Sequence, residues 1–173
     1  GDGQVHPGWP QSMGHVPGSS AAVGDITGDG VPEIVMESYD QLYVWDTAGN
    51  ALPGFPYTLP YGAVNSYSSP VLVDIDADSI REIVFGTHVL GGGGYVIVLE
   101  NDATAVPGWP RQTNYWIYGP PAVGYIDGDN ILDIAVGDQV LSVSPTDRVY
   151  AWNANGQPLS GVPIGPVNAV NNQ

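Results

Sequence analysis

The sequence contains no cysteine and no lysine, and its only basic residues are Arg81, Arg111 and Arg148. The lack of cysteine excludes disulfides, thiolate metal sites and a cysteine nucleophile. Eighteen acidic residues against three arginines give a formal net charge of −15. Nucleic acids and anionic membrane surfaces both require a positive patch on their partner, so neither is an expected partner. No apolar run approaches the ~20 residues that span a bilayer, so no direct membrane insertion is expected.

Helical periodicity is also missing, whereas glycine and proline are abundant. The chain has 24 glycines and 16 prolines among 173 residues. Both residue types are poor in helix interiors and common in turns. No segment keeps a helical spacing of apolar residues over three turns. The length suffices for one domain with a core, which we expect to consist of many short strands.

An acidic phrase of nine residues occurs three times, at 25–33, 74–82 and 125–133. Oxygen-bearing side chains stand at positions 1, 3, 5 and 9, except that Tyr125 holds position 1 of the third copy. Ten of the 18 acidic residues lie in these phrases. A tight loop that turns alternate oxygens inward suits calcium, which takes about six to eight oxygen ligands. The spacing therefore predicts calcium loops; general surface acidity, the alternative, does not account for it.

A second marker sets the period of a longer repeat. Pro-Gly-Trp-Pro at 7–10 recurs as Pro-Gly-Phe-Pro at 53–56, Pro-Gly-Trp-Pro at 107–110 and Ser-Gly-Val-Pro at 160–163. The copies begin roughly 50 residues apart, a period typical of solenoids, propellers and arrays.

The order of segments is the same within each period. A small apolar strand precedes the acidic loop, two strands rich in β-branched and aromatic residues follow it, and the Pro-Gly-aromatic-Pro segment comes last. Proline donates no ladder hydrogen bond, so this last segment is predicted as a fourth strand at the sheet edge. The expected strands are 20–23, 33–36, 42–45, 70–73, 82–85, 95–99, 121–124, 133–136 and 149–152.

Four antiparallel strands with this order describe a propeller blade. We therefore predict an all-β fold of three blades with an orphan N-terminal edge strand at 5–10. The predicted parts are an edge strand and linker at 1–18 that complete a preceding or neighbouring blade, blade 1 at 19–59, blade 2 at 60–112, blade 3 at 113–167 and a tail at 168–173. The large aromatic residues, among them Trp9, Trp45, Phe55, Trp109 and Trp152, are expected to fill the space between blades.

The run from Ser19 to Val35 resembles the FG-GAP/VCBS repeat of integrin-type β-propellers, and the other two copies match it with drift. The resemblance covers nearly the whole chain. It implies one calcium ion in each loop between the first and second strands. It also implies an extracellular or cell-surface protein that serves adhesion, ligand binding or carbohydrate binding. Some members are accessory to, or fused with, hydrolases and lyases.

The resemblance also assigns calcium ligands position by position. Two sites are expected, with a third that is weaker because Tyr125 replaces an acid. At position 6, Gly30 matches the family, Ser79 departs from it, and Asn130 tolerates the left-handed geometry that the turn requires. The implied ligands are Asp25, Thr27, Asp29, Glu33 and the Val31 carbonyl; Asp74, Asp76, Asp78, Glu82 and the Ile80 carbonyl; and Asp127, Asp129, Asp133 and the Ile131 carbonyl.

The most variable loops lie on the face opposite the acidic loops, and variable loops on a repeated scaffold usually carry binding specificity. They include 61–67, 87–94, 114–118 and 137–147. We expect the aromatic residues of these loops to stack on sugar rings or contact a protein partner. Packing between blades is the alternative interpretation, and both stay open. The candidate ligand-binding residues are Tyr61, Tyr67, Tyr115, Trp116 and Tyr118.

Three blades are fewer than the roughly four to eight of closed propellers. The chain is expected to belong to a larger propeller, to close with a second copy, or to add its edge strand to a neighbouring subunit in a fibre or sheath. Catalysis is not expected, because His6, His15 and His88 do not recur with the repeat and no catalytic motif occurs. The predicted function is a non-enzymatic calcium-binding segment that acts by adhesion, binding or self-assembly. A polysaccharide lyase or carbohydrate-binding propeller is the remaining alternative.

Overall fold

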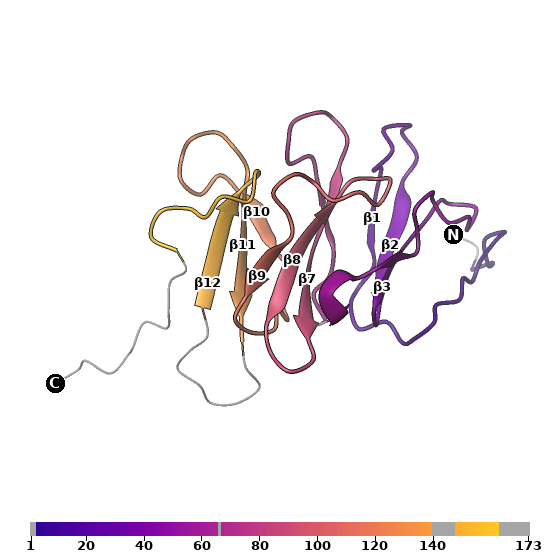
Figure 1. The fold of residues 1–173 in the computed structure, drawn as a ribbon. Helices are drawn as coiled ribbons and strands as arrows, with labels where there is room; N and C mark the ends of the chain where they lie inside the picture. Colours follow the sequence, from indigo (N-terminus) through magenta and orange to yellow (C-terminus); the bar gives the residue numbers. More distant parts are fainter. Residues whose placement is uncertain (1–2, 66, 140–147, 163–173) are drawn as a thin grey trace.

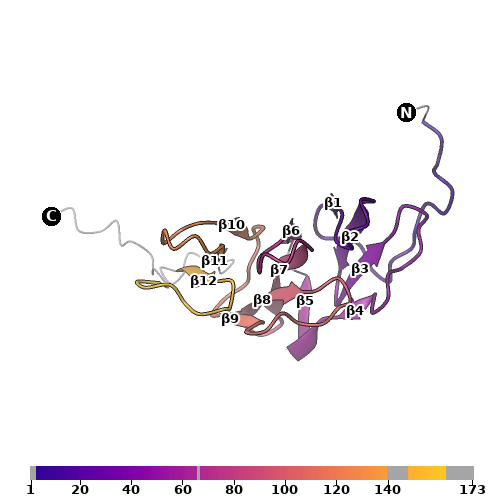
Figure 2. The same cartoon turned by 90° about the horizontal axis from the view of Figure 1, so that it is seen from above.

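The computed structural model describes residues 3–65, 67–139 and 148–162, and throughout them the fold is all-β, as predicted. Three antiparallel sheets stand side by side in chain order, each sheet forming one blade (Figures 1 and 2). The one helical element within these ranges is a single 3-10 turn at Pro60–Gly62. No helix in the described ranges has the length and apolar character needed to cross a membrane.

The strands follow the predicted order within each blade. Blade 1 has the order β1-β2-β3-β4, blade 2 has β5-β7-β8-β9 with β6 also paired to β7, and blade 3 has β10-β11-β12 in its described part. In blade 1 the strands are β1 (Ala22–Gly24), β2 (Glu33–Ser38), β3 (Gln41–Trp45) and β4 (Tyr57–Thr58). In blade 2 they are β5 (Ala63–Asn65), β6 (Val71–Val73), β7 (Glu82–Val89), β8 (Gly94–Leu99) and β9 (Arg111–Thr113). In blade 3 they are β10 (Ala122–Gly124), β11 (Asp133–Asp138) and β12 (Arg148–Asn153).

The strand register places the acidic loops at the same end of every blade. Gly24 pairs with Glu33, Val73 with Glu82 and Gly124 with Asp133. Each acidic loop therefore closes a hairpin, between β1 and β2, β6 and β7, or β10 and β11. In Figure 1 the three loops lie along the upper rim.

The hydrophobic core lies between the blades. One cluster joins Val35 and Val44 of blade 1 to Phe85 and Leu99 of blade 2, and another joins blade 2 to blade 3. Successive side chains of a strand point to opposite faces of its sheet. In blade 2 both faces are buried, because Phe85 packs in the cluster with blade 1 and Val84 in the cluster with blade 3. The predicted burial of the aromatic residues is confirmed for four of the five; Trp9 is half-buried. The four buried rings are Trp45, Phe55, Trp109 and Trp152.

The Pro-Gly-aromatic-Pro segments differ from the prediction, because they are turns and not strands. Their glycines adopt positive φ, which breaks a strand. The backbone N–H of the aromatic residue closes each turn, for example from Trp9 to the His6 carbonyl at 3.0 Å. The fourth strand begins only afterwards, in β4 and β9. The prediction of an orphan edge strand at 5–10 is therefore wrong, because this segment contains the same kind of turn.

Blade 2 has one strand more than predicted. β5 arises from the segment 61–67, which was expected to be a recognition loop, and it pairs with the far end of the long strand β7. Pro163 of the fourth marker, the tail 168–173 and most of the loop 137–147 lie outside the described residues.

Candidate metal centre

The three acidic loops share one backbone conformation. Position 4 has positive φ in each copy, at Gly28, Ala77 and Gly128 (φ 77, 66 and 85°). Position 6 does too: φ is 84° at Gly30, 77° at Ser79 and 64° at Asn130. These two left-handed residues, with one residue between them, curl the chain so that backbone N–H groups point into the loop. The second loop adopts this geometry without glycine, although positive φ is unfavourable for residues that have a Cβ atom.

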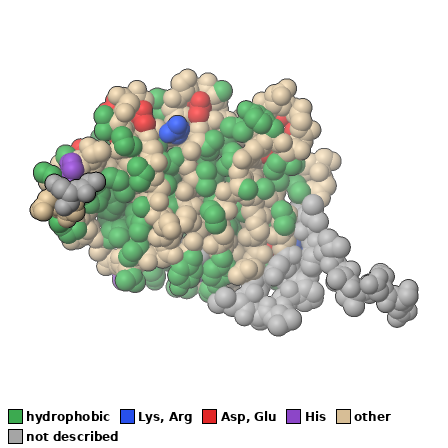
Figure 3. Space-filling model, turned by 180° about the vertical axis from the view of Figure 1, so that it is seen from behind, with side chains coloured by type: hydrophobic (Ala, Val, Ile, Leu, Met, Phe, Trp, Pro, Cys, Tyr) green, Lys and Arg blue, Asp and Glu red, His purple; other side chains and the backbone are tan. Residues whose placement is uncertain are grey.

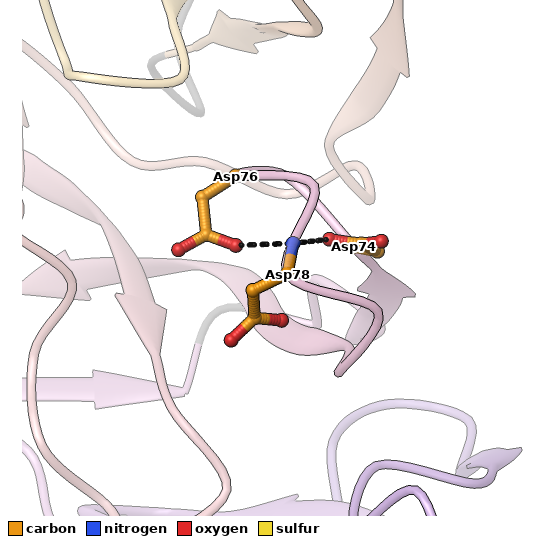
Figure 4. A group of neighbouring side chains, drawn as sticks. All are labelled: Asp74, Asp76 and Asp78. Atoms are coloured by element: carbon orange, nitrogen blue, oxygen red, sulfur yellow. Dashed lines mark hydrogen bonds between the residues drawn. The ribbon is translucent and has the colours of Figure 1, made fainter.

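The second loop gathers the densest group of carboxylates. One oxygen from each of Asp74, Asp76 and Asp78 lies within 4.8 Å of the others. Figure 4 shows the backbone nitrogen of Asp78 between two of these carboxylates, donating to Asp74 at 3.1 Å and to Asp76 at 3.2 Å. Calcium–oxygen distances are roughly 2.3–2.6 Å, so ligands of one ion lie up to about 5 Å apart. The spacing of the three oxygens fits a single calcium ion.

Glu82 stands at position 9 of the second loop and is fully buried. Its Oε2 accepts the N–H of Ile75 at 2.7 Å, while Oε1 has no hydrogen-bond partner among the described residues. Burial, together with the charges of Asp76, Glu100 and Asp78, raises its pKa to about 7. A buried carboxylate oxygen without a donor is unusual in a folded protein. Glu82 lies outside the group formed by Asp74, Asp76 and Asp78, and its role as a ligand stays a prediction.

The prediction from sequence missed Glu100, which follows β8 directly. Burial raises the pKa of its carboxyl first, and the charges of Asp76, Asp78 and Asp102 raise it further. The second loop thus has a neighbouring acid from a different hairpin. The only sequence signal for Glu100 was its place directly after the third predicted strand of its blade. Asp46 and Asn153 hold the same place in the other two blades.

The first loop is organised around Asp25, whose oxygens accept the N–H groups of Thr27, Gly28 and Gly30 at 3.2, 2.7 and 2.9 Å. Burial acts to raise the pKa of Asp25, but these backbone donors outweigh it and leave the pKa lowered. Asp29 accepts from Val31 at 2.8 Å. Thr27 Oγ1 is buried without a partner in the described part of the chain.

Glu33 closes the first loop as Glu82 closes the second. Its Oε2 accepts the N–H of Ile26 at 3.0 Å. Burial raises its pKa, and the charges of Asp29 and Asp25 raise it further. The two loops also touch, because a Cβ on Gly28 would lie 2.6 Å from the Ile80 side chain.

The third loop keeps the framework but lacks the first acid. Asp127 accepts from Asp129 N at 3.1 Å, and Asp133 accepts from Ile126 N at 2.7 Å. The other oxygen of Asp133 is buried and has no partner within the described ranges. Tyr125 is 66% exposed, so it turns to solvent where the other loops have an inward carboxylate. The backbone ligands predicted at Val31, Ile80 and Ile131 stay predictions.

A cleft of about 440 Å³ separates the second and third loops. Asp74 and Asp76 line one side, Tyr125 and Asn130 the other, and Asn155 lies at its edge. The carboxylates of the second loop are therefore open to solvent on the side that faces blade 3.

The candidate aromatic residues gather only in part. Tyr67 stacks on Tyr118 with centroids 6.1 Å apart, Tyr118 contacts Trp116, and Trp116 contacts His88 at 4.3 Å. Tyr61 instead packs on Tyr95. The backbone N–H of Tyr115 donates to Asp138, and its carbonyl accepts from the Thr113 hydroxyl.

A groove of about 290 Å³ adjoins these rings. His15, Tyr39, Tyr67, His88 and Leu90 line it. Tyr39 and His88 lie at the ends of β2 and β7 away from the acidic loops, so this groove occupies the opposite rim of the blades.

No family model matches the chain, and no curated protein matches it. Two solved structures resemble it. BBS1N, solved in complex with ARL6DN in crystals soaked with lead, is 17% identical over 82% of this chain and 41% of its own, with a TM-score of 0.49. The V. cholerae biofilm matrix protein Bap1 is 19% identical over 80% of this chain and 27% of its own, with a TM-score of 0.41. The chain thus spans less than half of either protein, and the blade architecture follows from its own three sheets.

Proposed function

We propose that the chain is a calcium-binding propeller segment of the FG-GAP/VCBS kind, non-enzymatic, which acts outside the cell by binding, adhesion or self-assembly. The observation that carries this proposal is the cluster of Asp74, Asp76 and Asp78 in a loop between two strands. The loop offers oxygen ligands only, the set that hard cations such as calcium take, whereas zinc and copper favour nitrogen and sulfur.

The ion would relieve charge repulsion that the fold itself creates. Three aspartates converge in the second loop, and Glu82 and Glu100 lie beside them. An ion that binds only the folded chain stabilises it, and the stabilisation grows with the logarithm of the ion concentration once this exceeds Kd. Calcium would therefore brace the hairpin of β6 and β7, and the working surfaces of the protein would lie elsewhere.

A calcium titration followed by thermal unfolding tests the proposal. Millimolar calcium should raise the unfolding midpoint relative to chelator, and Asp76→Asn should remove most of that rise. Asp40→Asn is the matched control, because Asp40 lies outside the three loops and should keep the full rise. An unchanged midpoint in the wild-type chain between chelator and calcium would refute the calcium site.

A carbohydrate-binding role is the second candidate, favoured by the row of rings from Tyr67 through Tyr118 and Trp116 to His88 beside a groove. Rings with open faces stack on sugars. Calorimetry with neutral and acidic oligosaccharides should give binding that Trp116→Ala abolishes and Tyr61→Ala preserves. A depolymerisation assay on the same glycans separates binding from lyase activity; product formation would overturn the non-enzymatic proposal.

A further inference from the structure

The Pro-Gly-aromatic-Pro turns form a repeated contact between neighbouring blades. We call the segments 7–10, 53–56 and 107–110 the clasps, and the turns 46–50, 100–104 and 153–157 after the third strand the receiving turns. The clasp glycines have φ of 85, 85 and 95°. Each receiving turn is closed by the same hydrogen bond, such as Asp46 N to Asn50 O at 2.9 Å.

Each clasp packs on the receiving turn of the blade that follows it in the chain. A Cβ on Gly8 would overlap the carbonyl of Ala48, one on Gly54 that of Asp102, and one on Gly108 that of Asn155. The contact therefore requires glycine at this position and brings two backbones together.

Aromatic contacts complete two of the three clasps. The Trp9 indole donates to the Thr47 carbonyl at 2.9 Å and meets the Trp45 ring edge-on at 5.9 Å. Trp109 does the same with Ala154 at 2.8 Å and with Trp152 at 5.9 Å. The Phe55 side chain has no N–H to donate, and its clasp still forms. An indole is therefore not essential to the contact.

The fourth copy of the marker has the clasp conformation but no receiving turn in the described chain. Gly161 has φ of 86°, and Val162 N donates to the Leu159 carbonyl at 3.3 Å as in the other copies. No heavy atom of the described residues lies within 4 Å of a Cβ built on Gly161. The segment 160–162 is thus a clasp whose partner surface is unfilled within the described structure.

The opposite end of the row has a blade face that is only half covered. Ile34, Met36 and Tyr43 are half-buried. The residues in the same register of blade 3, Ile134, Val136 and Tyr150, are all buried against blade 2. A neighbouring blade therefore covers this face wherever one is present in the molecule.

The outer face of blade 3 supplies small side chains that fit such a neighbour. Ala135 and Ala151 pair at the positions that Val35 and Val44 hold in blade 1. Val149 beyond them is 49% exposed, Ala135 is half-buried and Ala151 is 4% exposed. Small residues on this face leave room for the larger Met36 and Tyr43. Alternation of small and large groups across facing layers is how cores interdigitate.

From these observations we propose that two copies of this chain join head to tail. The clasp 160–162 of one copy docks on the receiving turn 46–50 of another. Blade 3 of the first copy then covers the open face of blade 1 of the second. The inference deepens the self-assembly part of the proposed function and rests on it. The contact is heterologous, so it builds a ring if the rotation closes and a filament if it does not.

The N-terminal clasp 7–10 competes for the same receiving turn. It is joined to blade 1 through 11–16, where Gly14 and His15 donate to Tyr43 and Ser38 and most of the segment is exposed. Its removal from the turn should therefore favour association. Trp9→Ala takes away both the indole hydrogen bond and the ring contact that hold it.

Sedimentation equilibrium of the full chain in millimolar calcium tests the proposal. We expect Trp9→Ala to associate roughly tenfold or more tightly than wild type. Adding Val162→Asp to Trp9→Ala should return the chain to wild-type behaviour, since a charge would be buried in the clasp. Leu90→Asp is the matched control: Leu90 is 64% exposed in the β7–β8 turn, and its replacement should leave the association intact.

A monomeric Trp9→Ala variant with native circular dichroism would overturn the proposal, as would association that Val162→Asp leaves unchanged. If Trp9→Ala does not fold, the pair Thr47→Cys and Val162→Cys in the otherwise cysteine-free chain replaces it. Mild oxidation should then give a disulfide between position 47 of one copy and 162 of another, found by peptide mapping. Absence of that peptide also overturns the proposal. Calcium binding measured on the same variants keeps this outcome separate from the metal site.

Discussion

The Trp109 indole N–H donates to the Ala154 carbonyl at 2.8 Å, and this single bond joins the end of blade 2 to the receiving turn of blade 3. The two residues lie 45 positions apart in the chain. Trp109 is also nearly buried and meets Trp152 edge-on. The residue therefore contributes both a hydrogen bond and buried apolar area to the seam between two blades.

Replacement of Trp109 separates these two contributions. Trp109→Phe should lower the free energy of unfolding by about 1 kcal/mol, the typical net value of one hydrogen bond. Trp109→Ala should lower it by about 3–5 kcal/mol, because a large buried ring is lost. Denaturant unfolding measures both. Trp116→Phe, outside the clasp and its receiving turn, should have the smaller effect, and equal losses from Trp116→Phe and Trp109→Phe would contradict the role of the indole bond.

Glycine replacement in the clasps isolates the close backbone approach. Gly54→Ala and Gly108→Ala should each destabilise the chain by more than about 1 kcal/mol, since they add both positive-φ strain and overlap with a carbonyl. Gly161→Ala introduces the same kind of strain at φ 86° without that overlap within the described chain. The difference in unfolding free energy between these variants measures the overlap alone. If all three lose the same amount, the clasps have no close approach.

Stability of the calcium-free chain should fall as the pH rises. The Glu82 carboxyl has a pKa near 4.5 when unfolded and about 7 when folded. Its contribution is therefore fully present below pH ~4.5 and lost as the pH rises through ~7. Thermal unfolding in chelator should give a lower midpoint at pH 8 than at pH 5.5, and Glu82→Gln should flatten that difference. A midpoint difference that persists unchanged in Glu82→Gln would assign it to other groups.

The third loop offers a gain-of-function test. Tyr125→Asp restores position 1, where Asp25 accepts three backbone N–H groups in the first loop. We expect calorimetry to detect tighter calcium binding by several-fold and a rise in the number of bound ions. Tyr39→Asp, which adds the same charge on the opposite rim, is the control. Equal gains from both variants would mean that general charge, and not the loop, sets the affinity.

Local patterns predicted most of the architecture because they rest on local physics. The β-branched residues along 33–36 and 82–85, with an acidic loop before each, are enough to place the hairpins that β2 and β7 form. The left-handed residue at position 6 of each loop was likewise readable at Gly30 and Asn130.

The errors arose where contacts are distant in the chain. The clasps were predicted as strands from their place after the third strand, and proline put them at the sheet edge. The glycine before each aromatic residue instead makes a turn that fits the backbone of the next blade, 38 or 45 residues away at the two indole bonds. Glu100 was missed because its closeness to the second loop depends on how β8 packs beside that loop. Both relationships depend on how segments that are distant in the chain pack together.

The clasps have a consequence for how such a chain changes length. The clasps 53–56 and 107–110 each connect the last two strands of one sheet and contact the receiving turn of the next, so a tandem duplication that copies one blade also copies its junction. Insertion or loss of a whole unit then regenerates every junction with the same backbone approach. The number of blades is free to drift over evolution while the chemistry of the junction stays fixed.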